Sequence, residues 1–221
     1  MLKVNILLLI SLPINIYQTK NLDIKDVPAS QTLSGSWQVE FQGKYGLDKT
    51  FTFDNLINWK DSTNKAIQAY SGIASYRQTF TVNDDLIDDT HQVYLDLGNV
   101  SDTAQVFING KEVGVTWIAP FKLEVSDFLQ RGDNDIRVDV ASSWINRMIT
   151  DEAYPDTSGL WDDKGNMVKT MPAWYTENKP LPQGKRQTFT TYKFINKTDP
   201  LVDAGLIGPV TLSAVKALEL E

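Results

Sequence analysis

The sequence predicts an all-β fold, an antiparallel sandwich or barrel, and three observations support this prediction. Short segments in which apolar and polar residues alternate follow one another at regular spacing. These segments are rich in Val, Phe, Tyr and Thr, which are favoured in strands, and Gly, Asn and Asp bound them. Between them there is no helical pattern ten residues long. Strands at such spacing without intervening helices are typical of sandwiches and barrels.

Alternating segments account for the strands that we expect in the first 142 residues. They are SWQVEF (36–41), KTFTF (49–53), SYRQTFTV (75–82), HQVYLDLG (91–98), AQVFING (104–110), KLEVSDFL (122–129) and DIRVDVAS (135–142). One short helix is expected within residues 54–69. After a long irregular stretch, FTTYKFI (189–195) and GPVTLSAV (208–215) are expected to complete the sandwich.

Two turns between these segments have characteristic residues. Asn109-Gly110 accepts a positive φ at both positions, so the segments AQVFI and EVGVTW on either side of it are expected to form a hairpin. The tripeptide Gly132-Asp133-Asn134 lies between SDFLQ and DIRVDV and predicts a second tight turn.

The sandwich is expected to be a single domain over residues 30–215, preceded by a segment at 1–29. Residues 1–17 have two interpretations. Lys3 and the apolar run after it have the charge and length of a signal-peptide core, but no small-x-small cleavage site follows. Residues 2–10 also alternate as a buried strand does, and we favour that interpretation. The run is too short and too interrupted for a membrane span.

Composition excludes several classes of function. The chain has 221 residues, of which 42% are hydrophobic, enough for the core of one large domain. The net charge is −7, from 21 basic and 28 acidic residues, and an acidic surface repels nucleic acid. The chain has no cysteine, which excludes thiol catalysis, disulfides and Cys-ligated zinc. The single histidine, His91, is too few for a His-rich metal site.

Several motifs occur in a familiar order along the chain. In the strand region these are Tyr76-Arg77, Leu97-Gly98-Asn99-Val100, Val106-Phe107-Ile108-Asn109-Gly110 with Gly114, and Gly132-x-Asn134. Together they resemble the sugar-binding jelly-roll domain of family 2 glycoside hydrolases. Four later motifs are WINRMITDE (144–152), PAWY (172–175), TFTTYKF (188–194) and GLIGPV (205–210). These are similar to the C-terminal β-sandwich of family 106 α-L-rhamnosidases.

The resemblance implies an antiparallel jelly-roll β-sandwich of the galactose-binding-domain-like type. In both families, paired carboxylates on a TIM barrel carry out catalysis, and this chain has no βα repeats from which to build one. The implied function is therefore that of a non-catalytic carbohydrate-binding or accessory module of a rhamnosidase-like glycoside hydrolase.

The same resemblance implies a plant or microbial polysaccharide as ligand, a glycoside hydrolase catalytic domain as partner, and a bacterial periplasmic or secreted location. Two alternatives remain open. The chain is either a purely structural docking domain for a catalytic barrel or partner subunit or, as a more distant alternative, a self-sufficient glycosidase.

The candidate carbohydrate site lies in the long irregular insertion at 143–187. Aromatic rings stack on the apolar face of a sugar, and planar polar groups bond its hydroxyls. The insertion supplies both kinds of side chain, and one further candidate follows the hairpin. The candidates are Trp144, Asn146, Arg147, Trp161, Trp174 and Tyr175, together with Trp117.

A competing interpretation of the same residues is structural. Trp144 and Trp174 would cap the sandwich, and Arg147 would pair with Asp151 or Glu152 to hold the insertion in place. We favour this interpretation for any one residue, because most tryptophans are largely buried. For the set as a whole, we expect at least one to contact a ligand or partner.

Carboxylate pairs are not expected to be catalytic here. Adjacent acids in polar turns are usually solvated, and the pair beside an aromatic residue, Asp162-Asp163, is the strongest exception. The oxygens of Asp156, Ser158 and this pair give a weak signal for a structural calcium ion, although no Asp-x-Asp-x-Asp-Gly loop is present. No other cofactor is expected.

Overall fold

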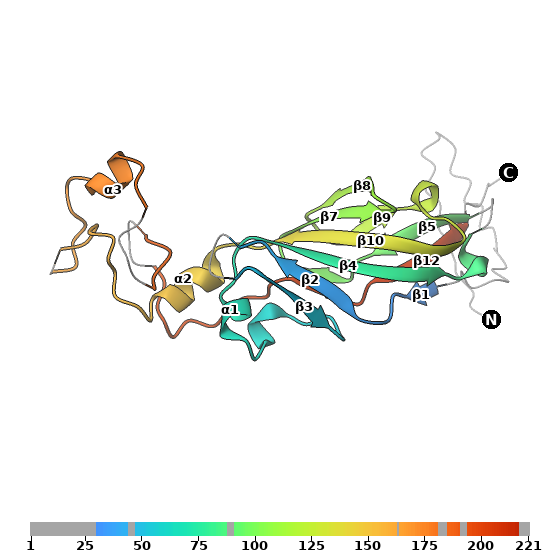
Figure 1. Ribbon diagram of the computed structural model, residues 1–221, viewed down its shortest axis with the longest axis horizontal. Coiled ribbons are helices and arrows are strands. Elements are labelled where there is room, and N and C mark those ends of the chain that lie inside the picture. Colours follow the sequence, from blue (N-terminus) through green and yellow to red (C-terminus); the bar gives the residue numbers. More distant parts are fainter. Residues whose placement is uncertain are drawn as a thin grey trace, which may run out of the picture.

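The chain forms an antiparallel β-sandwich in a computed structural model (Figure 1). The structure describes residues 30–43, 47–87, 91–162, 164–180, 185–190 and 194–216. Strands of these residues build two main sheets and one short two-stranded ladder. The all-β prediction is therefore confirmed. The two interpretations of residues 1–17 concern a segment outside the described residues.

The larger sheet has six strands and forms one layer of the sandwich. Its order is β3 (Lys49–Phe53), β2 (Trp37–Phe41), β4 (Ile73–Val82), β10 (Gly132–Ala141), β7 (Thr103–Ile108) and β8 (Lys111–Thr116). The two central strands, β4 and β10, pair over their whole length, from Gly132 opposite Val82 to Ala141 opposite Ile73. Both alternate strictly between core and solvent over most of that length, as their sequences predict.

The smaller sheet forms the second layer. Its order is β1 (Ser30–Thr32), β12 (Thr211–Lys216), β5 (His91–Asp96) and β9 (Lys122–Glu124). A short ladder joins β6 (Asn99–Val100) to β11 (Leu206–Gly208). Gly98 precedes this ladder with φ of 66°, and a Cβ there would lie 2.5 Å from the carbonyl carbon of Gly208. Only glycine fits at this crossing, which explains one of the motifs noted in the sequence.

Helical segments are short. They are η1 (Trp59–Asp61), α1 (Lys65–Gln68), η2 (Asp84–Leu86), η3 (Ser126–Phe128), α2 (Ile145–Asp151) and α3 (Ala173–Thr176). The helix expected within residues 54–69 is confirmed as α1, which Asn64 caps by accepting a hydrogen bond from the Ala66 amide. No helix of the described residues is long and apolar enough to cross a membrane.

Aromatic rings fill the part of the core where β2, β4 and η1 meet. The Phe41 ring lies 4.8 Å from that of Tyr70 and 5.3 Å from that of Trp59, measured between centroids. The Tyr76 hydroxyl accepts hydrogen bonds from Trp59 Nε1, at 2.7 Å, and from the Leu206 amide, at 3.2 Å. Burial raises the pKa of Tyr76 far above its ordinary value, so this hydroxyl stays protonated and links β4 to β11.

The predicted hairpin is confirmed. Strands β7 and β8 pair on either side of Asn109 and Gly110, whose φ angles are 52° and 76°. The Asn109 side chain also reaches the neighbouring loop, where its Nδ2 donates to the Phe128 carbonyl at 2.9 Å and to Asn134 Oδ1 at 2.8 Å. The hairpin tip is thus tied to the start of β10.

The turn predicted at residues 132–134 is misplaced. These residues already pair with β4. The buried Asn134 side chain accepts a hydrogen bond from the Gln130 amide and donates one to the Gln130 carbonyl, so the chain reverses direction before β10 begins. The strand predicted over residues 122–129 is also too long. It ends at Glu124, whose carboxylate accepts the Ser126 amide and starts η3.

The predicted strand at residues 189–195 is wrong in its described parts. Residues 189–190 and 194–195 belong to no strand. Phe189 packs instead on the rings of Trp174 and Tyr175, at 5.2 and 6.3 Å between centroids. The irregular segment that begins after β10 carries α2 and α3 and extends away from one end of the sandwich (Figure 1).

Candidate functional site

Asn146 ties helix α2 to the chain segment that leads into β11. The Asn146 side chain donates to the Val202 carbonyl and accepts from the Val202 amide, each at 2.8 Å. This buried amide therefore makes the pair of bonds that a neighbouring strand would make. Asn146 was a candidate for bonding sugar hydroxyls, and here its amide group is engaged by the chain itself.

Asp151, at the end of α2, holds a second part of the chain. Its carboxylate is fully buried, and its Oδ2 accepts hydrogen bonds from the Gln187 amide, the Thr188 amide and the Thr188 hydroxyl, each at 2.8 Å. Arg147 Nη1 lies 3.9 Å from Asp151 Oδ1. Burial lowers the pKa of Arg147, and the neighbouring carboxylate opposes that shift. Of the two pairs that the structural interpretation offered, the structure forms Arg147–Asp151.

Glu152 pairs with a residue that the sequence analysis did not select. Arg186 donates to Glu152 Oε1 and, through Nε, to the Thr188 carbonyl at 2.9 Å. Arg186 is buried, although it lies in a polar stretch that reads as an exposed loop. No periodic pattern connects two residues 34 positions apart, so only the tertiary structure reveals the pair.

The Arg186–Glu152 pair forms one wall of a small pocket. The pocket has a volume of about 170 Å³ and is lined by Glu152, Tyr154, Asp156, Trp161, Arg186 and Thr190. It combines aromatic rings, carboxylates and a guanidinium group, the side chains that bind the faces and hydroxyls of sugars. Pockets that enclose a drug-sized ligand measure about 300–1,000 Å³. This pocket is smaller than that range, so it has room only for a small group.

The turn that follows Trp161 uses a carboxylate for structure. Asp162 Oδ1 accepts the amides of Lys164 and Asn166, at 2.9 and 2.8 Å. The hydrogen bond from the Asn166 amide is the main reason why the pKa of Asp162 lies below its ordinary value. Asp162 therefore closes a turn here, and its neighbour at 163 lies outside the described residues.

The two aromatic candidates on α3 lie together. The Trp174 and Tyr175 rings are 5.8 Å apart, and Trp174 Nε1 donates to the Ser158 carbonyl at 2.6 Å. Trp174 is thus half-buried and fixed by contacts within the irregular segment, with Ser158, Tyr175 and Phe189, and these contacts do not place it as a cap on the sandwich. Tyr175 is 53% exposed.

The remaining candidates, Trp117 and Trp144, lie at one end of the larger sheet. Thr116 pairs with Ala104, and Thr103 pairs with Ala141, so the chain leaves β8 and β10 at the same end. Trp117 is 71% exposed and Trp144 is 39% exposed. The structure therefore divides the seven candidates among several places and does not join them in one site.

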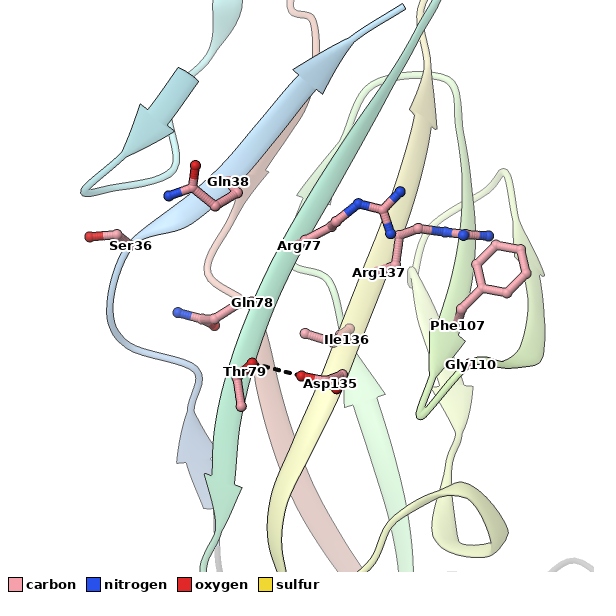
Figure 2. Close-up of a pocket in the computed structure, with 10 residues that line it drawn as sticks. All are labelled: Ser36, Gln38, Arg77, Gln78, Thr79, Phe107, Gly110, Asp135, Ile136 and Arg137. Carbon is pink, nitrogen blue, oxygen red and sulfur yellow. Dashed lines mark hydrogen bonds between the residues drawn. The ribbon is translucent and has the colours of Figure 1, made fainter. Parts of the chain in front are cut away.

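The outer face of the larger sheet carries a groove that the sequence analysis did not single out. It has a volume of about 420 Å³, and Figure 2 shows ten residues that line it. They include Gln38, Arg77, Phe107 and Arg137, one from each of four adjacent strands. Alternation assigns Arg77 to the polar face of its strand, but register alone determines what lies beside it.

Among the residues that the structure describes, no three His, Cys, Asp or Glu side chains are grouped in a way that could hold a metal ion.

A family model and two curated relatives match this chain. The family model described as "Glycosyl hydrolase 2 galactose-binding domain-like" matches residues 54–176. A putative β-glucuronidase of Formosa agariphila is 38% identical over 192 residues, 87% of this chain. A β-galactosidase of Streptococcus thermophilus is 34% identical over 84 residues. The chain spans 16% and 8% of these two proteins.

Solved structures give the same fold. A rhamnosidase from Novosphingobium sp. PP1Y matches 90% of this chain with a TM-score of 0.66 and 27% identity, over 16% of its own length. A β-glucuronidase from Bifidobacterium dentium matches 88% of this chain with a TM-score of 0.55 and 19% identity, over 31% of its length. Both likenesses support the sandwich predicted from the sequence.

Proposed function

Because the chain belongs to the glycosyl hydrolase 2 galactose-binding domain-like family, we propose that it is the non-catalytic accessory module of a larger glycoside hydrolase. The curated relatives are several times longer than the aligned region, and both are named as glycosidases. The paired strands of the described residues are all antiparallel, whereas a TIM barrel needs parallel strands alternating with helices. Catalysis would then reside elsewhere in the longer protein.

The pocket beside Trp161 is the observation that carries a carbohydrate-binding role. Trp161 and Tyr154 contribute aromatic rings to its lining, and Asp156 and Glu152 contribute carboxylates, which can accept hydrogen bonds from hydroxyl groups. The Asp151 hydrogen bonds described above hold one wall in place, so the pocket is organised before a ligand arrives. The ligand class would be a polysaccharide end or branch, and the setting would be the bacterial periplasm or the cell exterior.

The experiment compares the wild type with Trp161→Ala in calorimetric titrations with rhamnose-, galactose- and uronate-containing oligosaccharides. The variant should lose roughly tenfold or more in affinity, because one stacking residue is removed, while its melting temperature stays nearly unchanged. Trp117→Ala is the matched control, since Trp117 lies at another part of the molecule. Loss of affinity in Trp117→Ala alone would move the site to the end of the sheet. The same mixtures are assayed for released sugar, and release would contradict a non-catalytic role.

A docking role has its own supporting observation. Trp117 and Ile118 are 71% and 64% exposed and adjacent in the loop after β8, which is unusual for large apolar side chains on a free surface. If the isolated chain binds none of the sugars and self-associates in light scattering, and Trp117→Ser abolishes that association, the docking role replaces the carbohydrate-binding one.

A further inference from the structure

The groove on the outer face of the larger sheet contains a row of four side chains. Gln38 is opposite Arg77, Arg77 is opposite Arg137, and Arg137 is opposite Phe107, on strands β2, β4, β10 and β7. Side chains opposite one another on one face of a sheet lie about 5 Å apart at Cβ. Figure 2 shows the Arg77 side chain extending toward Arg137. The row therefore places two guanidinium groups side by side in the groove.

Two like charges directly opposite each other destabilise a strand pair unless something compensates them. The neighbouring carboxylates compensate only in part. Glu40 lies 3.8 Å from Arg77 Nη2, and Asp139 lies 3.4 Å from Arg137 Nε. Charge-assisted hydrogen bonds between nitrogen and oxygen measure about 2.7–2.9 Å, so both pairs are looser than that. The arginines retain donors for a further oxyanion.

The orientation of Arg137 is fixed by its neighbour. Its guanidinium carbon lies 3.7 Å from the centre of the Phe107 ring, a stacked cation–π arrangement. This contact uses a face of the guanidinium plane and none of its N–H donors, which lie at the edges of the plane. A group that binds to these edges would bridge toward Arg77.

The side chain of Gln78, which follows Arg77 on β4, lies on the opposite, core-facing side of the sheet. Gln78 is 9% exposed, and its Nε2 donates to the Ser34 carbonyl at 2.9 Å. Its Oε1 is buried and has no hydrogen-bond partner among the described residues. A buried acceptor without a donor costs free energy. Because this oxygen is enclosed on the core side, it takes no part in binding in the groove on the outer face.

We propose that this groove is a second binding site, for an acidic glycan whose oxyanion, a carboxylate or a sulfate, lies between Arg77 and Arg137. The oxyanion follows from the two arginines, whereas the choice of a glycan as its carrier rests on the proposed function. The groove volume of about 420 Å³ falls within the usual range for ligand sites. Asp135, which accepts from Thr79 at 2.6 Å, adds a carboxylate for the sugar hydroxyls. None of these residues lines the Trp161 pocket.

The test titrates the chain with three probes: trigalacturonate, a sulfated galactotetraose and neutral galactotetraose. Arg77→Gln should weaken binding of an acidic probe roughly tenfold or more. Arg131→Gln, which removes the same charge from an exposed turn, should change it less than about twofold. Arg137→Lys keeps the positive charge but removes the planar guanidinium group that stacks on Phe107, and it should also weaken binding of the acidic probe. The carboxylated and sulfated probes identify which oxyanion the site prefers.

The outcomes separate this inference from the proposed function. If the acidic probes bind to Arg77→Gln as tightly as to the wild type, the groove is not their binding site. In that case, loss of binding of the neutral probe in Trp161→Ala would still support the Trp161 pocket. A second outcome is that no oligosaccharide binds, but free glucuronate or sulfate shifts the NMR resonances of the Arg77 and Arg137 side chains. This outcome would support an anion site and refute a glycan as the carrier of the anion. Absence of both effects overturns the site and leaves this face as a surface for docking.

Discussion

The Asp151 carboxylate is the single group on which the Trp161 pocket depends most. Its Oδ2 accepts three hydrogen bonds from Gln187 and Thr188, and these bonds hold the residue before them, Arg186, in the pocket wall. Asp151→Ala removes all three acceptor contacts and leaves two backbone amides without their partner. We expect this substitution to release residues 185–190 from α2 while the sandwich remains folded.

The magnitude follows from the burial of Asp151. A hydrogen bond to a charged group contributes about 1.5–3 kcal/mol, and contributions within one network do not add fully. Removing one partner of a buried charged pair costs about 3–5 kcal/mol, which we take as the expected loss for opening this segment. At 1.36 kcal/mol for each tenfold change, that loss corresponds to about two to four orders of magnitude in local opening.

Amide hydrogen exchange measures this opening residue by residue. The protection of the Gln187 and Thr188 amides should fall by that factor, or to the rate of an unprotected amide if their wild-type protection is smaller. The Val138 amide, in the centre of β10, should be unaffected. Asp199→Ala is the matched control, because the hydrogen bond that the Asp199 carboxylate accepts among the described residues is a local one, from the Asn196 amide at 2.8 Å. Unchanged protection at Gln187 and Thr188 would refute the role given to Asp151.

Two further predictions concern stability and charge. Tyr76→Phe removes the acceptor of two buried donors, Trp59 Nε1 and the Leu206 amide, and should lower the free energy of unfolding in urea by about 2–4 kcal/mol; a loss below about 1 kcal/mol would contradict it. The hydrogen bond from Lys60 is the largest cause of the lowered pKa of Asp203. The pairing of these two residues therefore stabilises the fold above about pH 3.9, the ordinary pKa of an aspartate, and this stabilisation disappears as the pH falls through the lowered pKa of the folded state. In Lys60→Gln, NMR titration should show that pKa returning toward its ordinary value, and an unchanged pKa would exclude Lys60 as the cause.

Strand predictions were confirmed where alternating segments also pair with a neighbouring strand. The prediction was wrong where the side chains of an alternating segment pack on an irregular segment instead. Strand β4 and the β7–β8 hairpin follow from their own residues, since period two and the Asn109-Gly110 turn are local signals. The segment at 189–195 has the same alternation, yet Phe189 joins a ring cluster with Trp174. A strand needs a partner edge as well as a pattern, and the pattern cannot show whether an edge is present.

The candidate site was predicted as a segment and not as an arrangement. Aromatic content identified the stretch that contains Trp161, and the expected ion pair of Arg147 with Asp151 spans a single helical turn. Arg186 was missed, because its partner Glu152 is distant in the sequence. The sugar-binding roles of the seven candidate residues stay predictions.

The sequence by itself determined the properties that depend on neighbours along the chain. These are the all-β class, the faces of the strands, the tight hairpin turn and the family to which the motifs belong. The tertiary structure decided what lies together across strands and between segments, including the opposition of Arg77 and Arg137 and the burial of Arg186 beside α2. The physical reason is that a strand's own residues specify which face each side chain occupies, whereas register and long-range packing specify what each side chain meets.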